Sequence, residues 1–184
     1  IVMNIFLTCY GVDTRHKESI NSYDEIIDVL RNKRVVIIPN ARLIGENRDS
    51  SYNVYKELKK NNIYCEIVDI DSNDLNLSYF DAIYFTGGEP KYLMNSVYNN
   101  NLFDLINNFI INGGIIIGQS AGAMIFNKQY IDTSTHKIRI IDNGFDFCDR
   151  VIVPHFDCLS EDILNFLPDN ILKINDSDGV IKLD

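Results

Sequence analysis

The stretch Ile115–Met124, I-I-I-G-Q-S-A-G-A-M, decides the fold of this chain. Its three isoleucines predict a strand buried on both faces, and the small residues after them predict a sharp turn into a helix. Within it, Gly118–Gly122 fits the pattern G-x-S-x-G, in which small residues two positions either side of a serine let strand and helix pack closely. The serine of such a turn has a strained backbone, so we expect an unfavourable φ/ψ combination at Ser120.

A plain strand–glycine–helix corner would show the same five residues, with Ser120 as the helix N-cap. The strand before the turn and the further small residue Ala123 favour a nucleophile instead. The free N–H groups of the following helix would then face the negative charge that develops beside the serine. Ser120 is therefore the candidate nucleophile.

Strands alternate with helices on the N-terminal side of this turn. Strands are expected at Asn4–Tyr10, Arg34–Pro39, Tyr64–Ile70, Ala82–Thr86 and Ile115–Gly118, and helices at Ser19–Arg31, Ser50–Asn61, Pro90–Tyr98 and Leu102–Asn112. After residue 127, short strands that are partly antiparallel are expected at Lys137–Ile141, Arg150–Val153, Ile171–Ile174 and Val180–Leu183, with a helix at Glu161–Phe166. The alternation predicts an α/β fold, a three-layer sandwich with a mostly parallel central sheet, in one domain over residues 1–184.

Composition narrows the class of partner and the compartment. The 184 residues carry 17 basic and 26 acidic side chains, a net charge of -9, which disfavours binding to nucleic acid or to anionic lipid. No apolar run approaches the roughly 18 residues that span a bilayer. The four cysteines lack C-x-x-C spacing, so we expect reduced thiols in a cytoplasmic protein.

A serine nucleophile needs a base, and the chain has three histidines. His16 and His136 lie in polar stretches typical of solvated loops. His155 follows the apolar Val151–Pro154, which places it at the end of a strand, although a buried structural histidine would fit the same position. A second turn, Gly87-Gly88, closes the strand Ile83–Phe85, and its N–H groups could form half of an oxyanion hole or satisfy only a need for positive φ.

Three segments together resemble the signatures of peptidase family S51, which includes aspartyl dipeptidase (peptidase E) and cyanophycinase. They are F-T-G-G-E-P-K-Y-L-M (85–94), I-I-I-G-Q-S-A-G-A-M (115–124) and V-P-H-F-D (153–157). The resemblance implies a class I glutamine amidotransferase-like (flavodoxin-like) fold. It also implies Ser120 as nucleophile, His155 as general base, an oxyanion hole from the amides of Gly88 and Ala121, and an acyl-enzyme formed without metal or organic cofactor.

The third member of the triad is left open between three aspartates. In the family a carboxylate follows the histidine near the start of a late strand, and the matching position here is Ser177, between Asp176 and Asp178. We favour Asp178 because a glycine follows it, as in aspartyl dipeptidase. Asp176 and the more distant Asp132 are the alternatives.

The leading hypothesis is a serine peptidase that hydrolyses short peptides and could form a homodimer. An α/β-hydrolase esterase shares G-x-S-x-G, but its acid precedes the histidine; a non-catalytic amidotransferase-like binding protein would keep the elbow without a working triad. The family often has Asn after the paired glycines, where Glu89 and Pro90 stand here.

Substrate charge is a further departure from the family. Its dipeptidase carries arginines in the helical region after the histidine, whereas Asp157–Asn170 contains no arginine or lysine. We therefore expect neutral peptides to be better substrates than peptides with an N-terminal aspartate. The cations that could still reach the site are Arg42, Arg48, Lys91 and Arg150.

Overall fold

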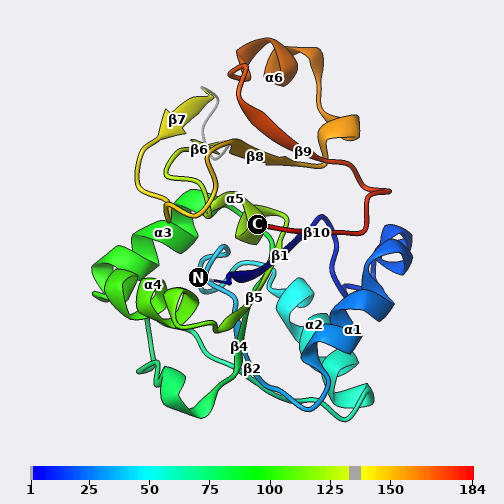
Figure 1. The fold of residues 1–184 in the computed structure, drawn as a ribbon, viewed down its shortest axis with the longest axis vertical. Coiled ribbons are helices and arrows are strands. Elements are labelled where there is room, and N and C mark those ends of the chain that lie inside the picture. Colours follow the sequence, from blue (N-terminus) through cyan, green and yellow to red (C-terminus); the bar gives the residue numbers. More distant parts are fainter. Residues whose placement is uncertain (1, 133–137) are drawn as a thin grey trace.

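The centre of the protein is a six-stranded sheet in the order β10-β1-β5-β4-β2-β3 (Figure 1). The structure is a computed structural model that describes residues 2–132 and 138–184. The strands are β1 (Asn4–Thr8), β2 (Arg34–Ile38), β3 (Tyr64–Ile67), β4 (Ala82–Phe85), β5 (Ile115–Gln119) and β10 (Val180–Lys182). All neighbours in this sheet run parallel except β10, which pairs antiparallel with β1.

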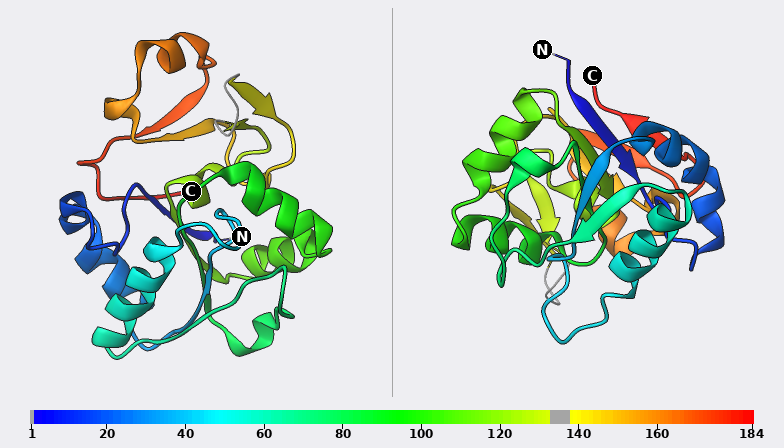
Figure 2. Two further views of the ribbon diagram at one scale, coloured as in Figure 1. Left: turned by 180° about the vertical axis from the view of Figure 1, so that it is seen from behind. Right: turned by 90° about the horizontal axis from the view of Figure 1, so that it is seen from below.

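Helices cover both faces of the sheet, as Figures 1 and 2 show. One face packs against α1 (Tyr23–Leu30) and α2 (Asp49–Lys60), and the other against α3 (Pro90–Asn99) and α4 (Phe103–Ile111). Successive residues of β2 show the division, because Val35 and Ile37 join the α1/α2 core whereas Val36 and Ile38 join the α3/α4 core. The predicted three-layer α/β sandwich with a mostly parallel sheet is confirmed.

The chain after α5 (Ala121–Met124) forms two small two-stranded sheets. In the first, β6 (Tyr130–Asp132) pairs antiparallel with β7 (Arg139–Ile141); in the second, β8 (Val151–Pro154) pairs parallel with β9 (Ile171–Ile174). The segment between β8 and β9 contains a 3-10 turn (Phe156–Cys158) and α6 (Glu161–Phe166). Partly antiparallel pairing was expected here, whereas β6 was not predicted. His136 and the expected strand start at Lys137 lie outside the described residues.

The sheet brings three loops to one edge. Thr8 of β1 is in register with Gln119 of β5, and Phe85 of β4 is in register with Gly118. The segments that follow these parallel strands therefore emerge together at their carboxyl ends, where ligand sites of open α/β sheets form. None of the described helices is long and apolar enough to cross a membrane.

Candidate active site

Ser120 lies on the turn between β5 and α5 with φ 54° and ψ -116°, so the predicted backbone strain is confirmed. Its N–H donates to the carbonyl of Thr8 at 2.9 Å, and its carbonyl accepts from the N–H of Ala123 at 2.8 Å. Both glycines of G-x-S-x-G are sterically required. A Cβ at Gly118 would lie 2.6 Å from the Gly122 carbonyl oxygen, and one at Gly122 would overlap the backbone of Phe85.

His155 ends β8 and faces the serine. Its Nε2 lies 2.9 Å from Ser120 Oγ, within hydrogen-bonding distance. The residue follows Pro154 and is left-handed, with φ 55° and ψ 32°, which turns its ring back toward the main sheet. Its backbone N–H donates to Cys9 Sγ at 3.3 Å, and the Tyr10 ring lies 4.8 Å from its own between centroids. The structure thus brings together the two residues that sequence reasoning paired.

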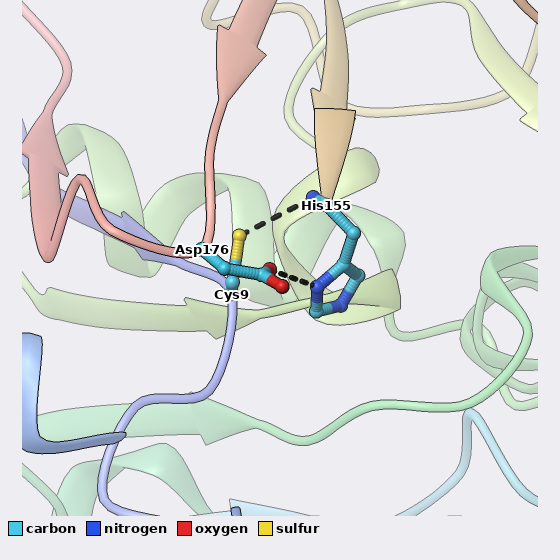
Figure 3. A group of neighbouring side chains, drawn as sticks. All are labelled: Cys9, His155 and Asp176. Carbon is cyan, nitrogen blue, oxygen red and sulfur yellow. Dashed lines mark hydrogen bonds and ion pairs between the residues drawn. The ribbon is translucent and has the colours of Figure 1, made fainter. Parts of the chain in front are cut away.

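Asp176, in the segment between β9 and β10, holds the far side of the ring. Its Oδ1 accepts from His155 Nδ1 at 2.7 Å (Figure 3). Its own N–H donates to Asp157 Oδ1 at 3.1 Å, and Cys158 Sγ donates to its Oδ2 at 3.2 Å. His155, Asp157 and Cys158 therefore fix Asp176 through both its carboxylate and its backbone N–H.

Asp176, and not the favoured Asp178, contacts the ring of His155 in this structure. Asp178 Oδ2 accepts the N–H of Asn175 at 2.6 Å, and the Asp178 N–H donates back to the Asn175 carbonyl at 3.0 Å. Its side chain is therefore used to close the turn that presents Asp176. Asp132 lies fully buried in β6, where it pairs with Lys91 at 3.7 Å and Arg139 at 3.9 Å.

The local electrostatics suit an ionised acid beside a neutral thiol. Burial alone would raise the pKa of Asp176, but the hydrogen bonds from His155 and Cys158 outweigh it and hold the pKa below its ordinary value. Burial raises the pKa of the Cys9 thiol to about 12, despite the hydrogen bond from the His155 backbone that lowers it. Asp176 therefore carries the negative charge that orients His155, while Cys9 remains protonated at neutral pH.

The glycine turn after β4 lies directly against the serine. A Cβ at Gly87 would be 3.3 Å from Ser120 Cβ, and Gly88 has φ +147° with its Cα facing the Ala41 backbone. Within the described residues, neither the N–H of Gly88 nor that of Ala121 donates to a protein acceptor. Both amides are available to a bound oxyanion, as the resemblance implies.

A polar network behind the serine was not predicted. Tyr84 donates to Gln119 Oε1 at 2.6 Å, Gln119 Nε2 donates to Ser50 Oγ at 3.1 Å, and Ser50 donates to Asp13 Oδ2 at 2.8 Å. Asp13 in turn binds Arg15 through two side-chain contacts of 2.9 and 2.8 Å. These residues could have been found from their positions, because they lie in or just after β1, β4 and β5 or at the start of α2.

Two cavities meet at the pair Ser120–His155. The larger, about 450 Å³, is a polar cleft lined by Asp13, Arg15, His16, Arg42, Asn47 and Ser50 among others. The smaller, about 160 Å³, extends on toward α6 and has a mainly apolar wall. His16, expected to be a solvated loop residue, lines the larger cleft, and its ring lies tilted against that of Tyr10 with 4.7 Å between centroids.

Cations do reach the larger cleft, although not from the segment after the histidine. Arg42 lines it, as does Arg15, which was not among the expected cations. Arg48 instead pairs with Asp69 at 2.5 Å, Lys91 faces Asp132, and Arg150 lies beside Asp149 at 3.7 Å. Arg15 was not predicted because it lies in the loop after β1, whereas the expectation about substrate charge rested on the segment after His155.

The side chains that could hold a metal overlap with the triad. Within the described chain, ligand atoms of Cys9, His155 and Asp176 lie within 4.8 Å of one another, as do those of Asp157, Cys158 and Asp176. These atoms are already engaged, since His155 Nδ1 binds Asp176 and Cys9 Sγ donates to the Ile174 carbonyl at 3.4 Å. All four cysteines are free thiols. The arrangement fits a hydrogen-bonded triad better than a metal centre.

Comparison with known proteins relates this chain to peptidases. The chain is 30% identical over 164 residues to an uncharacterized peptidase of Listeria monocytogenes, covering 83% of this chain and 78% of that protein. An uncharacterized peptidase of Listeria innocua is 28% identical over 164 residues, with 83% and 76% covered.

Two solved structures share the fold. A candidate peptidase E of Listeria monocytogenes superposes with a TM-score of 0.75 at 21% identity, covering 99% of this chain and 98% of that one. A peptidase from an acI-B1 actinobacterium gives 0.61 at 18% identity, with 90% and 72% covered. The profile of peptidase family S51 matches residues 5–178. The chain therefore belongs to peptidase family S51.

Proposed function

We propose that this peptidase is a serine peptidase that hydrolyses short peptides through Ser120, His155 and Asp176. The observation that carries the proposal is the continuous hydrogen-bonded chain from nucleophile to acid. Ser120 Oγ is 2.9 Å from His155 Nε2, and His155 Nδ1 is 2.7 Å from Asp176 Oδ1. A base held this way between nucleophile and carboxylate is the arrangement that activates a serine.

The roles follow from the positions of the atoms. Asp176 accepts a hydrogen bond from His155 Nδ1–H and stays ionised. This fixes the tautomer in which Nε2 is free to take the proton of Ser120 as Oγ attacks the peptide carbonyl carbon. The negative oxygen that forms is stabilised by the N–H groups of Gly88 and Ala121. His155 then gives the proton to the leaving amine, and an acyl-enzyme remains. Water attacks the acyl carbon, His155 takes its proton and returns it to Ser120 Oγ, and the carboxylate product leaves.

Two observations weigh against the alternatives. The acid follows the histidine in the chain, whereas the acid of an α/β-hydrolase esterase precedes it. A non-catalytic binding protein would have no need for a strained Ser120, since strain of this kind costs about 1–3 kcal/mol and persists where it serves function. The mechanism uses no metal or organic cofactor, so activity should survive chelation.

The test is active-site labelling together with hydrolysis of short peptides. A serine-directed phosphonate should modify Ser120, mapped by peptide mass spectrometry, and the variant Ser120→Ala should bind none. Dipeptides and tripeptides should be cleaved faster than a folded protein such as lysozyme or an unfolded one such as casein, and Ser120→Ala should lower turnover by roughly 10⁴- to 10⁶-fold. Labelling of another residue, or turnover that Ser120→Ala leaves unchanged, would contradict the proposal. Cleavage of simple esters alone would favour the esterase.

A further inference from the structure

The smaller of the two cavities at Ser120 is built differently from the larger. Its side-chain wall beyond the site is apolar and comes from α3, α5, β6, β8 and the segment after β8: Pro90, Met124, Ile131, Val153, Leu159 and Ile163. Leu159 and Ile163 belong to the segment between β8 and β9, which forms the outer wall. Among the described residues that line this pocket, His155 is the one titratable side chain.

The position of the pocket relates it to one side of the scissile bond. Gly88, Ser120 and Ala121 all line it, whereas the larger cleft borders Gly88 and Ser120 but not Ala121. The carbonyl oxygen under attack must point at the N–H groups of Gly88 and Ala121. The Cα of the residue that supplies this carbonyl is bonded directly to the reacting carbon. A side chain on that Cα is therefore the nearest substrate group to a cavity that contains both oxyanion donors.

We propose that this pocket, defined by Pro90, Met124, Ile131, Val153, Leu159 and Ile163, binds an apolar side chain of the residue that supplies the scissile carbonyl. The inference rests on the proposed function and adds a substrate class to it: short peptides with Leu, Met or Phe on the acyl side of the cleaved bond. The part of the peptide on the leaving side then lies in the polar cleft, where Arg42 and Arg15 face it.

The dimensions and the chemistry of the wall support this class. The pocket holds about 160 Å³, and an apolar protein cavity of roughly 150 Å³ accepts a molecule the size of benzene. An aspartate side chain there would lose its hydration, and the described residues that line the pocket include no lysine or arginine to pair with it. An alanine side chain would leave most of the volume empty. Each methylene missing from a substrate in a hydrophobic pocket lowers kcat/KM by roughly 10- to 200-fold.

The test compares two matched peptide series. In the X-Ala dipeptides, X is Leu, Met, Ala or Asp; in the Ala-X dipeptides the same residues stand on the leaving side. We expect kcat/KM for Leu-Ala to exceed that for Ala-Ala by at least about tenfold, and Asp-Ala to be slowest. The Ala-X series should vary much less.

A charge placed in the wall should reverse the preference. Ile163 is partly exposed, so Ile163→Arg should fold, lower kcat/KM for Leu-Ala and raise it for Asp-Ala. Leu164→Arg is the matched control, because Leu164 belongs to the same helix α6 and is 38% exposed without lining the pocket. It should leave the ratio of Leu-Ala to Asp-Ala unchanged.

A second measurement needs no variant. Phosphonates that carry a Leu side chain should label Ser120 of the wild-type protein at least about tenfold faster than those that carry an Asp side chain. Equal labelling rates, a preference for Asp-Ala, or selectivity confined to the Ala-X series would overturn the inference and leave the proposed function standing. Failure to hydrolyse any peptide, with Ser120 unlabelled, would overturn both.

Discussion

The site joins two regions of the molecule that differ in how deeply they are buried. Ser120 follows β5, where Ile116 and Ile117 are fully inaccessible to solvent and the sheet is covered on both faces. His155 and Asp176 follow β8 and β9, a two-stranded sheet whose connecting helix α6 has no buried residue. The nucleophile is therefore positioned by the main core, whereas Asp176 is positioned by hydrogen bonds with the residues that follow β8. His155 lies between the two regions, because the strand before it, β8, is buried in the main core. We therefore expect substitutions in the main sheet to lower stability most, and substitutions in the segments after β8 and β9 to lower activity most.

The largest difference should come from the two aspartates of the β9–β10 segment. Asp176→Asn removes the charge that orients His155 and should lower kcat by about 10⁴-fold, as expected when the acid of a serine triad is replaced by its amide. Asp178→Asn keeps the shape of the turn-closing side chain and should lower kcat by less than about tenfold, since a single hydrogen bond contributes roughly 0.5–1.5 kcal/mol. Steady-state kinetics on one dipeptide measure both. Equal losses would mean that the turn, rather than the charge of Asp176, controls the histidine.

Truncation of core side chains should separate the regions by stability. Ile116→Ala leaves a cavity in a sheet covered on both faces and should cost near the upper end of the roughly 2–5 kcal/mol typical of such changes. Leu172→Ala in β9, where 8% of the side chain is already exposed, should cost near the lower end. Urea unfolding followed by circular dichroism gives both values. A larger loss for Leu172→Ala would show that the β8–β9 sheet, not the main sheet, limits stability.

The thiol that binds the acid offers a finer test. Cys158→Ala removes the donor 3.2 Å from Asp176 Oδ2 but leaves the bond to His155. We expect kcat/KM to fall by no more than about tenfold, in line with one hydrogen bond. Cys65→Ala, at a buried cysteine remote from the site, is the control for activity. A loss as large as that of Asp176→Asn would assign Cys158 a direct role in the reaction.

The smallest effect should appear in the pH dependence of stability. Because the pKa of Asp176 is lowered on folding from its ordinary value of 3.8, its ionised form stabilises the folded state. This contribution is complete above the unfolded pKa and is lost as the pH falls through the lower folded pKa. The difference in unfolding free energy between wild type and Asp176→Asn should therefore be constant from pH 6 to roughly pH 5 and shrink as the pH falls further toward 3. A difference that grows on acidification would show that the folded pKa is raised instead.

Sequence patterns predicted the elements that the core determines. The five apolar runs became the parallel strands, and all but the edge strand β3 are covered on both faces. G-x-S-x-G predicted the strained turn because only small neighbours fit there. The segment V-P-H-F-D predicted that His155 stands at the end of a strand, because an apolar run precedes it.

The choice between Asp176 and Asp178 could not be made in the same way. Which carboxylate faces the ring depends on the bond between Asp178 and Asn175, a turn contact that carries no periodic signal. Arg42 was among the expected cations and lines the larger cleft, whereas Arg15 was not predicted, because it lies in the loop after β1, whose path depends on tertiary packing. The short strand β6 gave too few residues to show alternation.

The antiparallel pairing of β10 with β1 has a consequence for biosynthesis. Ser120 is made 35 residues before His155, which is made 21 residues before Asp176. Asp176 is held between β9 and β10, and β10 pairs with β1, which is synthesised long before it. A nascent chain can thus fold most of its parallel sheet while its serine still has no base. Under the proposed mechanism, the chain can cleave peptides only after these two distant strands pair. A partly synthesised chain would therefore be inactive toward neighbouring proteins.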